Sequence, residues 1–144
     1  MKRIVLLALV VSSLCVQNEL EFEERNFVAK VIDGDTIELR NEERIRLIGM
    51  NAPDSGEKCF KESKEKLEEL IFNENVNLEK DITNKDSYGR SLRYIYLGNS
   101  FVNLEMVKTG YAYALTIEPN VKYSEQLTEA EGTAEESKAG CLWS

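Results

Sequence analysis

The sequence predicts an α+β domain in which a small five-stranded β-barrel is supported by three helices. Three short segments rich in β-forming residues, Phe27–Ile32, Thr36–Arg40 and Arg44–Met50, alternate in polarity and are separated by polar turns. One helical pattern separates these segments from two further strand patterns, and two helical patterns follow. Three strands, a helix, two strands and then helices is the order expected of an OB-type barrel.

The turns between the first three strands are explicit in the sequence. Asp33-Gly34-Asp35 has the glycine-centred composition of a tight turn, and Asn41–Glu43 is a second polar turn. Gly49 lies near the end of the third strand pattern and predicts a bulge or bend there. We therefore expect the first three strands to form a meander.

The remaining elements follow from hydrophobic periodicity and from helix stop signals. The first helix has apolar residues on one face and lysines and glutamates on the other. Gly110 and Gly140 provide helix ends. The predicted elements are a helix from Glu57 to Phe72, strands over 75–82 and 91–97, a short helix over Val102–Lys108, and a last helix from Val121 to Ala139.

The first fifteen residues predict an export signal. Lys2 and Arg3 precede the apolar run Ile4–Val11, which is too short to span a bilayer stably. Ser12–Cys15 resembles a lipoprotein cleavage box, although Leu14 replaces the expected small residue, and Cys15 would then carry the lipid. The alternative is a buried N-terminal helix.

We divide the chain accordingly into a signal segment (1–15), an acidic spacer (16–26) and one folded domain (27–144). This division predicts an exported protein, either secreted or anchored through its N-terminus on the outer face of the cell membrane. We expect the domain to be a monomer.

Composition excludes several classes of site. The chain has no histidine, which removes imidazole zinc sites, Ser-His hydrolases and histidine general bases. Its net charge of −8 argues against avid non-specific binding to nucleic acid, but leaves room for a small basic cleft on an acidic body.

Two cysteines lie in the predicted domain, Cys59 and Cys141. In an exported protein such a pair suggests a disulfide, which would join the loop after Asp54 to the C-terminus. Two free, buried thiols are the alternative. No CxxC pair is present, so a cysteine zinc site is not expected.

Acidic and basic residues gather at predicted strand ends. Asp33 and Asp35 flank the first turn, Arg46 lies on the third strand, and Arg90 precedes the fifth. Carboxylates beside two guanidinium groups suit a metal-assisted attack on a phosphodiester. For Asp33, a role in shaping the turn through backbone hydrogen bonds is an equal alternative.

These segments resemble the staphylococcal nuclease (thermonuclease) family over the whole predicted domain. Several motifs occur in the family's order, which makes a chance match improbable. They are Val31-Ile-Asp-Gly-Asp-Thr36, Arg46-Leu-Ile-Gly-Met-Asn-Ala-Pro-Asp54, Asp86-Ser-Tyr-Gly-Arg-Ser-Leu-Arg-Tyr-Ile-Tyr96, Val102-Asn103 with Gly110-Tyr-Ala112, and a closing Leu-Trp.

The resemblance implies an OB-type barrel with three helices that cleaves DNA and RNA, usually with calcium. It assigns the target phosphate to Arg46 and Arg90, and the orientation or activation of the attacking water to Asp54. Tyr88 would stack on a base or sugar beside Arg90, the alternative being a tyrosine packed on the barrel rim. The family's tyrosine in the loop after Gly110 cannot be assigned to Tyr113.

The resemblance also implies a cation site made by Asp35, Asn51 and the backbone carbonyl of Ala52. Calcium is the expected ion, with another divalent cation as the alternative. Two positions depart from the family pattern: Asn51 stands where an aspartate is usual, and Asp54 where a glutamate is usual. A neutral ligand weakens a hard-cation site, and a shorter base sits farther from its water.

Two hypotheses about function follow. The first is an exported, metal-dependent endonuclease that hydrolyses phosphodiester bonds of DNA or RNA with little sequence specificity. The second is a catalytically weakened OB-fold module that binds nucleic acid or a protein partner. The arginines and Asp35 favour the first hypothesis, while Asn51, Asp54 and the acidic surface favour the second.

Overall fold

The computed structural model describes residues 26–144. The predicted signal segment with Cys15, and the spacer except Asn26, lie outside the described residues. The elements are β1 (Val28–Asp33), β2 (Thr36–Leu39), β3 (Arg44–Leu47), β4 (Met50–Asn51), α2 (Phe60–Ile71), β5 (Asn77–Glu79), β6 (Ser91–Leu97), β7 (Ser100–Phe101), α3 (Val102–Lys108), β8 (Tyr113–Ala114), α4 (Ser124–Glu136) and α5 (Gly140–Trp143).

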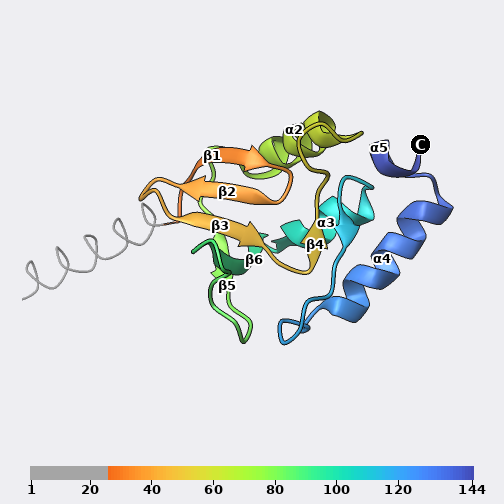
Figure 1. The fold of residues 1–144 in the computed structure, drawn as a ribbon. Helices are drawn as coiled ribbons and strands as arrows, with labels where there is room; N and C mark the ends of the chain where they lie inside the picture. Colours follow the sequence, from red (N-terminus) through yellow and green to blue (C-terminus); the bar gives the residue numbers. More distant parts are fainter. Residues whose placement is uncertain (1–25) are drawn as a thin grey trace, which may run out of the picture.

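The main sheet has the strand order β1-β2-β3-β6-β5, with β7 paired to β6 (Figure 1). The first three strands form the predicted antiparallel meander. Strand β6 then pairs in parallel with β3, so that Arg46 lies opposite Leu92. This parallel pairing brings the loop that precedes β6, which contains Arg90, beside the strand that carries Arg46.

The start of β1 is also bonded to the chain that leads into β5. The Val28 amide donates to the Glu74 carbonyl at 2.9 Å, and the Asn73 amide donates to the Val28 carbonyl at 3.1 Å. These bonds join the outer strands of the sheet at one end. A curved, sheet-rich core with several helices confirms the predicted α+β class and is consistent with an OB fold.

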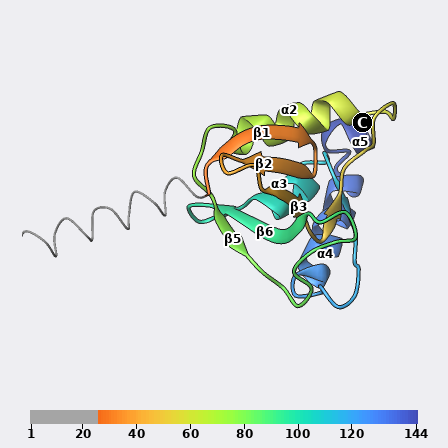
Figure 2. The same ribbon diagram turned by 60° about the vertical axis from the view of Figure 1, so that its left-hand side comes forward.

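Helix α2 lies along β1 and covers one side of the sheet, while α3 and α4 pack on each other at another side (Figures 1 and 2). The apolar residues that the strands and helices direct inward form one core. Its largest fully buried members include Ile37, Leu39, Ile45, Leu47, Leu67, Ile71, Tyr94, Ile95, Met106 and Leu127.

Several predicted boundaries were wrong, among them those of the strand expected over 75–82, which is only Asn77–Glu79. Backbone conformation explains two of the others. Gly49 has φ 78°, so the third strand stops at Leu47 and resumes as β4, which pairs with β8. Cys59 has φ 76°, and α2 therefore begins only at Phe60. The last helix starts three residues later than expected, at Ser124.

The C-terminal end of the last predicted helix also differs. Lys138 and Gly140 have φ 54° and 60°, which the right-handed helix cannot accommodate. Helix α4 ends at Glu136, and the last residues form the separate four-residue helix α5. The described residues thus contain four helices where three were predicted.

A disulfide joins Cys59 to Cys141, with Cα atoms 5.7 Å apart. It connects the residue just before α2 to α5 across 82 positions of sequence. Among residues 26–144, no helix combines the length and the hydrophobicity needed to cross a membrane.

Candidate active site

The Asp33-Gly34-Asp35 turn places one carboxylate inside the fold. The Asp35 amide donates to Asp33 Oδ1 at 3.0 Å, so Asp33 shapes the turn. Helix α2 and the chain after β4 pack closely against Gly34. A Cβ atom on Gly34 would lie 2.0 Å from Ser63 Oγ and 2.6 Å from Ala52 Cβ. Only glycine allows this close approach, which fixes the position of Asp35 relative to α2.

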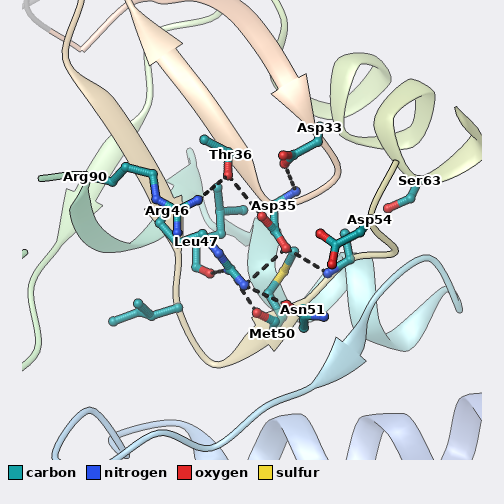
Figure 3. A network of polar contacts seen from close by, with 12 residues as sticks. Asp33, Asp35, Thr36, Arg46, Leu47, Met50, Asn51, Asp54, Ser63 and Arg90 are labelled. Atoms are coloured by element: carbon teal, nitrogen blue, oxygen red, sulfur yellow. Dashed lines mark hydrogen bonds and ion pairs between the residues drawn. The ribbon is translucent and has the colours of Figure 1, made fainter. Parts of the chain in front are cut away.

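The carboxylate of Asp35 is the centre of the polar network in Figure 3. Its residue is only 7% exposed, and the carboxylate accepts hydrogen bonds from the Ala52 amide at 2.9 Å and from Thr36 Oγ1 at 3.0 Å. Arg46 Nη2 lies 3.1 Å from Asp35 Oδ2. Burial raises the pKa of Asp35, while Arg46 and the Ala52 amide oppose that shift.

Arg46 is held by the turn between β3 and β4. Its Nη2 donates to Asn51 Oδ1 at 2.9 Å, and its Nη1 donates to the carbonyls of Met50, at 3.0 Å, and of Leu47. Burial lowers the pKa of Arg46, Asp35 raises it, and the like charge of Arg90 lowers it further. An arginine nonetheless stays protonated in proteins, so the site holds a fixed positive charge.

Arg90 approaches the same network from the loop before β6. Its Nε donates to Asp86 Oδ2 at 2.7 Å, and its Nη1 donates to Thr36 Oγ1 at 3.3 Å. Burial alone would raise the pKa of Asp86, but hydrogen bonds and charge from Arg90 outweigh it and lower that pKa. The Thr36 hydroxyl therefore connects Arg90 to Asp35, so that Asp35, Arg46 and Arg90 lie together (Figure 3).

Arg46 and Arg90 open into a cleft of about 410 Å³. Asn51 and the exposed Lys85 supply further polar groups, while one wall is aliphatic. The apolar lining side chains are Ile48, Leu92, Leu115 and Ile117. Sequence reasoning missed Leu115 and Ile117, because the loop after β8 has no periodic pattern that would show which residues face the cleft.

The two tyrosines considered for substrate contact lie in different surroundings. Tyr88 is 84% exposed, which speaks against packing on the barrel, and its ring centroid is 5.4 Å from Arg90 Cζ. Tyr113 lies on β8 opposite Asn51, and its ring packs edge-on against Trp143 at 5.6 Å. Neither tyrosine lines the cleft.

Asp54 lies in the loop over residues 52–59, beside the network but outside it (Figure 3). The residue is exposed, and its amide donates to Glu57 Oε2 at 2.7 Å. Within residues 26–144 its carboxylate makes no hydrogen bond or ion pair, so it is free to accept a proton. The structure does not bring Asp54 into contact with either arginine.

The proposed cation ligands are all oxygens, which suits a hard divalent ion. Asp35 and Asn51 both face Arg46, which shares their oxygens, and Asn51 adds no negative charge. Over the part of the chain that the structure describes, no cluster of three or more acidic or cysteine side chains is placed to hold a metal. The donor chemistry therefore fits a weak site that water and substrate oxygens would complete.

Comparison with known proteins agrees with this geometry. The family model described as staphylococcal nuclease homologue matches residues 44–144. The chain belongs to this family. The matched region includes both arginines, Asn51 and Asp54, whereas the turn with Asp35 precedes it.

Individual relatives extend the match through that turn. A thermonuclease of Staphylococcus hyicus is 34% identical over 131 residues, covering 85% of this chain and 77% of the relative. A thermonuclease of Staphylococcus intermedius is 34% identical over 129 residues, covering 83% and 76%. Endonuclease YncB of Bacillus subtilis is 31% identical over 130 residues, covering 80% and 59%.

Proposed function

We propose that this protein is a metal-dependent endonuclease that hydrolyses phosphodiester bonds of DNA or RNA with little sequence specificity. The observation that carries the proposal is the convergence of Arg46 and Arg90 on one cleft beside the buried Asp35. Family membership and the relatives named as thermonucleases and endonucleases support the same reaction.

The two guanidinium groups would bind the scissile phosphate. A guanidinium presents five donors in a plane, and Arg90 uses only two of them, on Asp86 and Thr36. Arg46 directs both of its Nη groups at protein acceptors, so a phosphate would bind through its Nε–H or by displacing one of those acceptors. Two such groups can hold the equatorial oxygens as negative charge develops on phosphorus. Because Asp86 fixes the position of Arg90 before substrate binds, this arginine needs little reorganisation in the transition state.

Asp54 is the proposed general base. Its unpaired, exposed carboxylate can accept the proton of a water that attacks in line with the leaving oxygen. Asp35, Asn51 and the Ala52 carbonyl would hold the cation. When bound, a divalent cation would stabilise charge on the phosphate and make the water more acidic.

The cleft walls support a substrate with bases beside the phosphate. Ile48, Leu92, Leu115 and Ile117 offer apolar surface that accepts any base without reading its hydrogen-bonding edge. Lys85 lies at the same cleft and could meet a neighbouring phosphate. This combination favours low sequence specificity.

Export is part of the proposal. The N-terminal segment supports it, and a disulfide is typical of oxidising compartments outside the cytoplasm. Secretion and anchoring through Cys15 differ in the mature N-terminus, and mass spectrometry of the mature protein distinguishes them.

The proposed nuclease is tested by incubating single-stranded DNA with calcium, with and without a chelator. We expect cleavage with calcium and none with chelator. Asp54→Ala should lower kcat by about 10²-fold or more, the usual range for loss of a general base. Glu62→Ala, at an exposed glutamate of α2, is the matched control and should retain full activity.

The second candidate function is a binding module without efficient catalysis, favoured by the neutral Asn51 at the cation site and by the short Asp54. Wild-type protein that binds DNA but fails to cut it, whichever divalent cation is added, would establish this function and overturn the first.

The substitution Asn51→Asp tests whether the protein has a weak cation site at residue 51 or no cation site there. A second carboxylate beside Asp35 should tighten calcium binding roughly tenfold, because affinity follows ligand charge. Isothermal titration calorimetry measures this directly, with Asn41→Asp in an exposed turn as the control. Unchanged affinity would show that residue 51 does not contact the cation.

A further inference from the structure

The loop that carries Asp54, residues 52–59, is buried at both ends and exposed in the middle. Its first residue is fixed by the bond from the Ala52 amide to Asp35. Residues 54–58 are all exposed, and the Asp54 amide bonds within the loop, to Glu57. A general base on such a loop needs support from elsewhere to keep its position.

Helix α5 supports this loop at its far end. Cys59, the last residue of the loop, is 5% exposed and is covalently joined to Cys141 of α5. Beside it, Lys58 Nζ donates to the Ser144 carbonyl at 3.3 Å. The C-terminus is thus attached to the loop at two neighbouring residues.

The same helix also supports the near end of the loop. Trp143 packs edge-on against Tyr113, which pairs across the β4–β8 ribbon with Asn51, the residue just before the loop. Helix α5 therefore contacts the structure on both sides of the loop, although it has only four residues. Figures 1 and 2 both show α5 beside the chain that runs from β4 to α2.

Close backbone packing holds α5 in place. The Leu142 amide donates to the Gly110 carbonyl at 3.2 Å. A Cβ on Gly110 would lie 2.0 Å from the Ala139 carbonyl oxygen, and one on Gly140 would lie 2.4 Å from the Gly110 carbonyl oxygen. Paired glycines let α5 sit directly against the end of α3, so it is a firm anchor for the disulfide.

We propose that the Cys59–Cys141 disulfide is a positioning element for Asp54, and that the enzyme reaches its full rate only in the oxidised form. This inference rests on the proposed nuclease function. A dithiol reductant would break the Sγ–Sγ bond: two electrons and two protons convert the pair to two thiols, and the reductant closes to its own disulfide. Loss of the covalent bond to α5 then loosens the far end of the loop, while α5 stays packed on the end of α3 and the arginines keep their own contacts.

The test compares kcat and KM for single-stranded DNA before and after reduction with dithiothreitol, in a Cys15→Ser background that prevents exchange with the third cysteine. We expect kcat to fall about tenfold or more, since a misplacement of about 1 Å can cost 10²-fold. KM, and the affinity for uncleaved DNA in chelator, should stay within about twofold, because phosphate binding does not depend on the loop.

The variant with Cys59→Ser and Cys141→Ser should show the same low kcat and no response to reductant. Lys58→Met removes the neighbouring hydrogen bond but keeps the disulfide, and should retain most of the activity. A reduced protein whose melting temperature falls but whose kcat is unchanged would show a purely stabilising bond and overturn the proposal. A reduced protein that is unfolded at every temperature would overturn it as well.

A second readout does not require catalysis. Hydrogen–deuterium exchange of the Asp54 and Glu57 amides, which are hydrogen-bonded within the loop, should speed up about tenfold on reduction, while exchange in β1, β2 and β3 stays unchanged. If the oxidised protein cuts no DNA, the nuclease function fails, yet this measurement still decides whether the disulfide holds the loop. Equal exchange of the loop in both forms would contradict the inference.

Discussion

At the scale of single residues, Thr36 explains how the site is assembled. Its hydroxyl donates to Asp35 and accepts from Arg90, while its backbone lies opposite Arg46 in the β2–β3 pair. Thr36 thus contacts Asp35 and Arg90 through its side chain and pairs with Arg46 through its backbone. The motif that contains Asp35 and Thr36 was recognisable in the sequence, as were both arginines, because each lies at a turn or strand end with a distinctive local pattern.

Arg46→Lys tests whether the planar guanidinium is needed. Lysine keeps the charge, but its single ammonium group cannot reproduce the planar set of bonds to Asn51, Met50 and Leu47 that holds the charge in place. We expect kcat to fall by about 10²-fold, comparable to removing one donor from an oxyanion site. Arg44→Lys on the same strand is the control, since Arg44 makes only an exposed pair with Glu38. A loss below about threefold would assign the phosphate to other groups.

At the scale of elements, the contact between α2 and the first turn sets the depth of Asp35. Ser63 is fully buried and donates to the Tyr111 carbonyl at 2.7 Å, with Gly34 packed against it. The helical period predicted that α2 would bury one face. It did not single out Ser63, because a buried serine is explained only by its partner on a distant segment.

Gly34→Ala probes this contact. The added methyl group would overlap Ser63 and Ala52, and overpacking of this kind costs about 1–3 kcal/mol of unfolding free energy. Urea denaturation measures the loss. The matched control is Gly132→Ala, where open space surrounds a helical glycine of α4 and the substitution should stabilise by up to about 1 kcal/mol. Equal effects at both positions would contradict the close packing of the turn.

The loop before β6 has its own stabilising contact. Asp86 accepts hydrogen bonds from the amides of Tyr88 and Arg90 and from the Arg90 side chain, which together hold the loop conformation that presents Arg90. The Asp-Ser-Tyr-Gly-Arg motif indicated a turn here, but only the folded structure shows the hydrogen bond between the side chains of Asp86 and Arg90.

Asp86→Asn should make the stability of the protein less dependent on pH. The pKa of Asp86 is lower in the folded protein than in the unfolded chain. The stability that the ionised carboxylate contributes is therefore fully present above about pH 4, and it is lost as the pH falls through the folded-state pKa. We expect the variant to lose about 1 kcal/mol at neutral pH and the difference to vanish in acid. Urea denaturation across that range checks this, with Asp54→Asn as the control whose stability should not change.

At the scale of the whole molecule, charge separates the cleft from the rest of the surface. The chain carries a net charge of −8, yet Arg46, Arg90 and Lys85 line a single cleft together with Asp86. An acidic body disfavours binding elsewhere along nucleic acid, so we expect binding to be limited to this cleft.

Binding to single-stranded DNA should therefore depend only weakly on salt. Three phosphate contacts predict a slope of log K against log salt concentration of about −2, from about 0.7 per contact. Fluorescence anisotropy in chelator measures the slope. Lys85→Gln should reduce its magnitude by about 0.7, whereas Lys61→Gln, an exposed lysine of α2, should not change it. A slope several times steeper would place binding on a broader surface.

The sequence by itself predicted the α+β class, the meander and its turns, and it named the arginines and acids that are candidates for the site. Local hydrophobic periodicity, and turn residues that lie within a few positions of one another, are enough to predict these features. Only the tertiary structure decided that Arg46 bonds to Asn51, that Leu115 and Ile117 line the cleft, and that the last residues form the separate helix α5. Such contacts depend on how segments far apart in the chain pack together, and no local pattern specifies that packing.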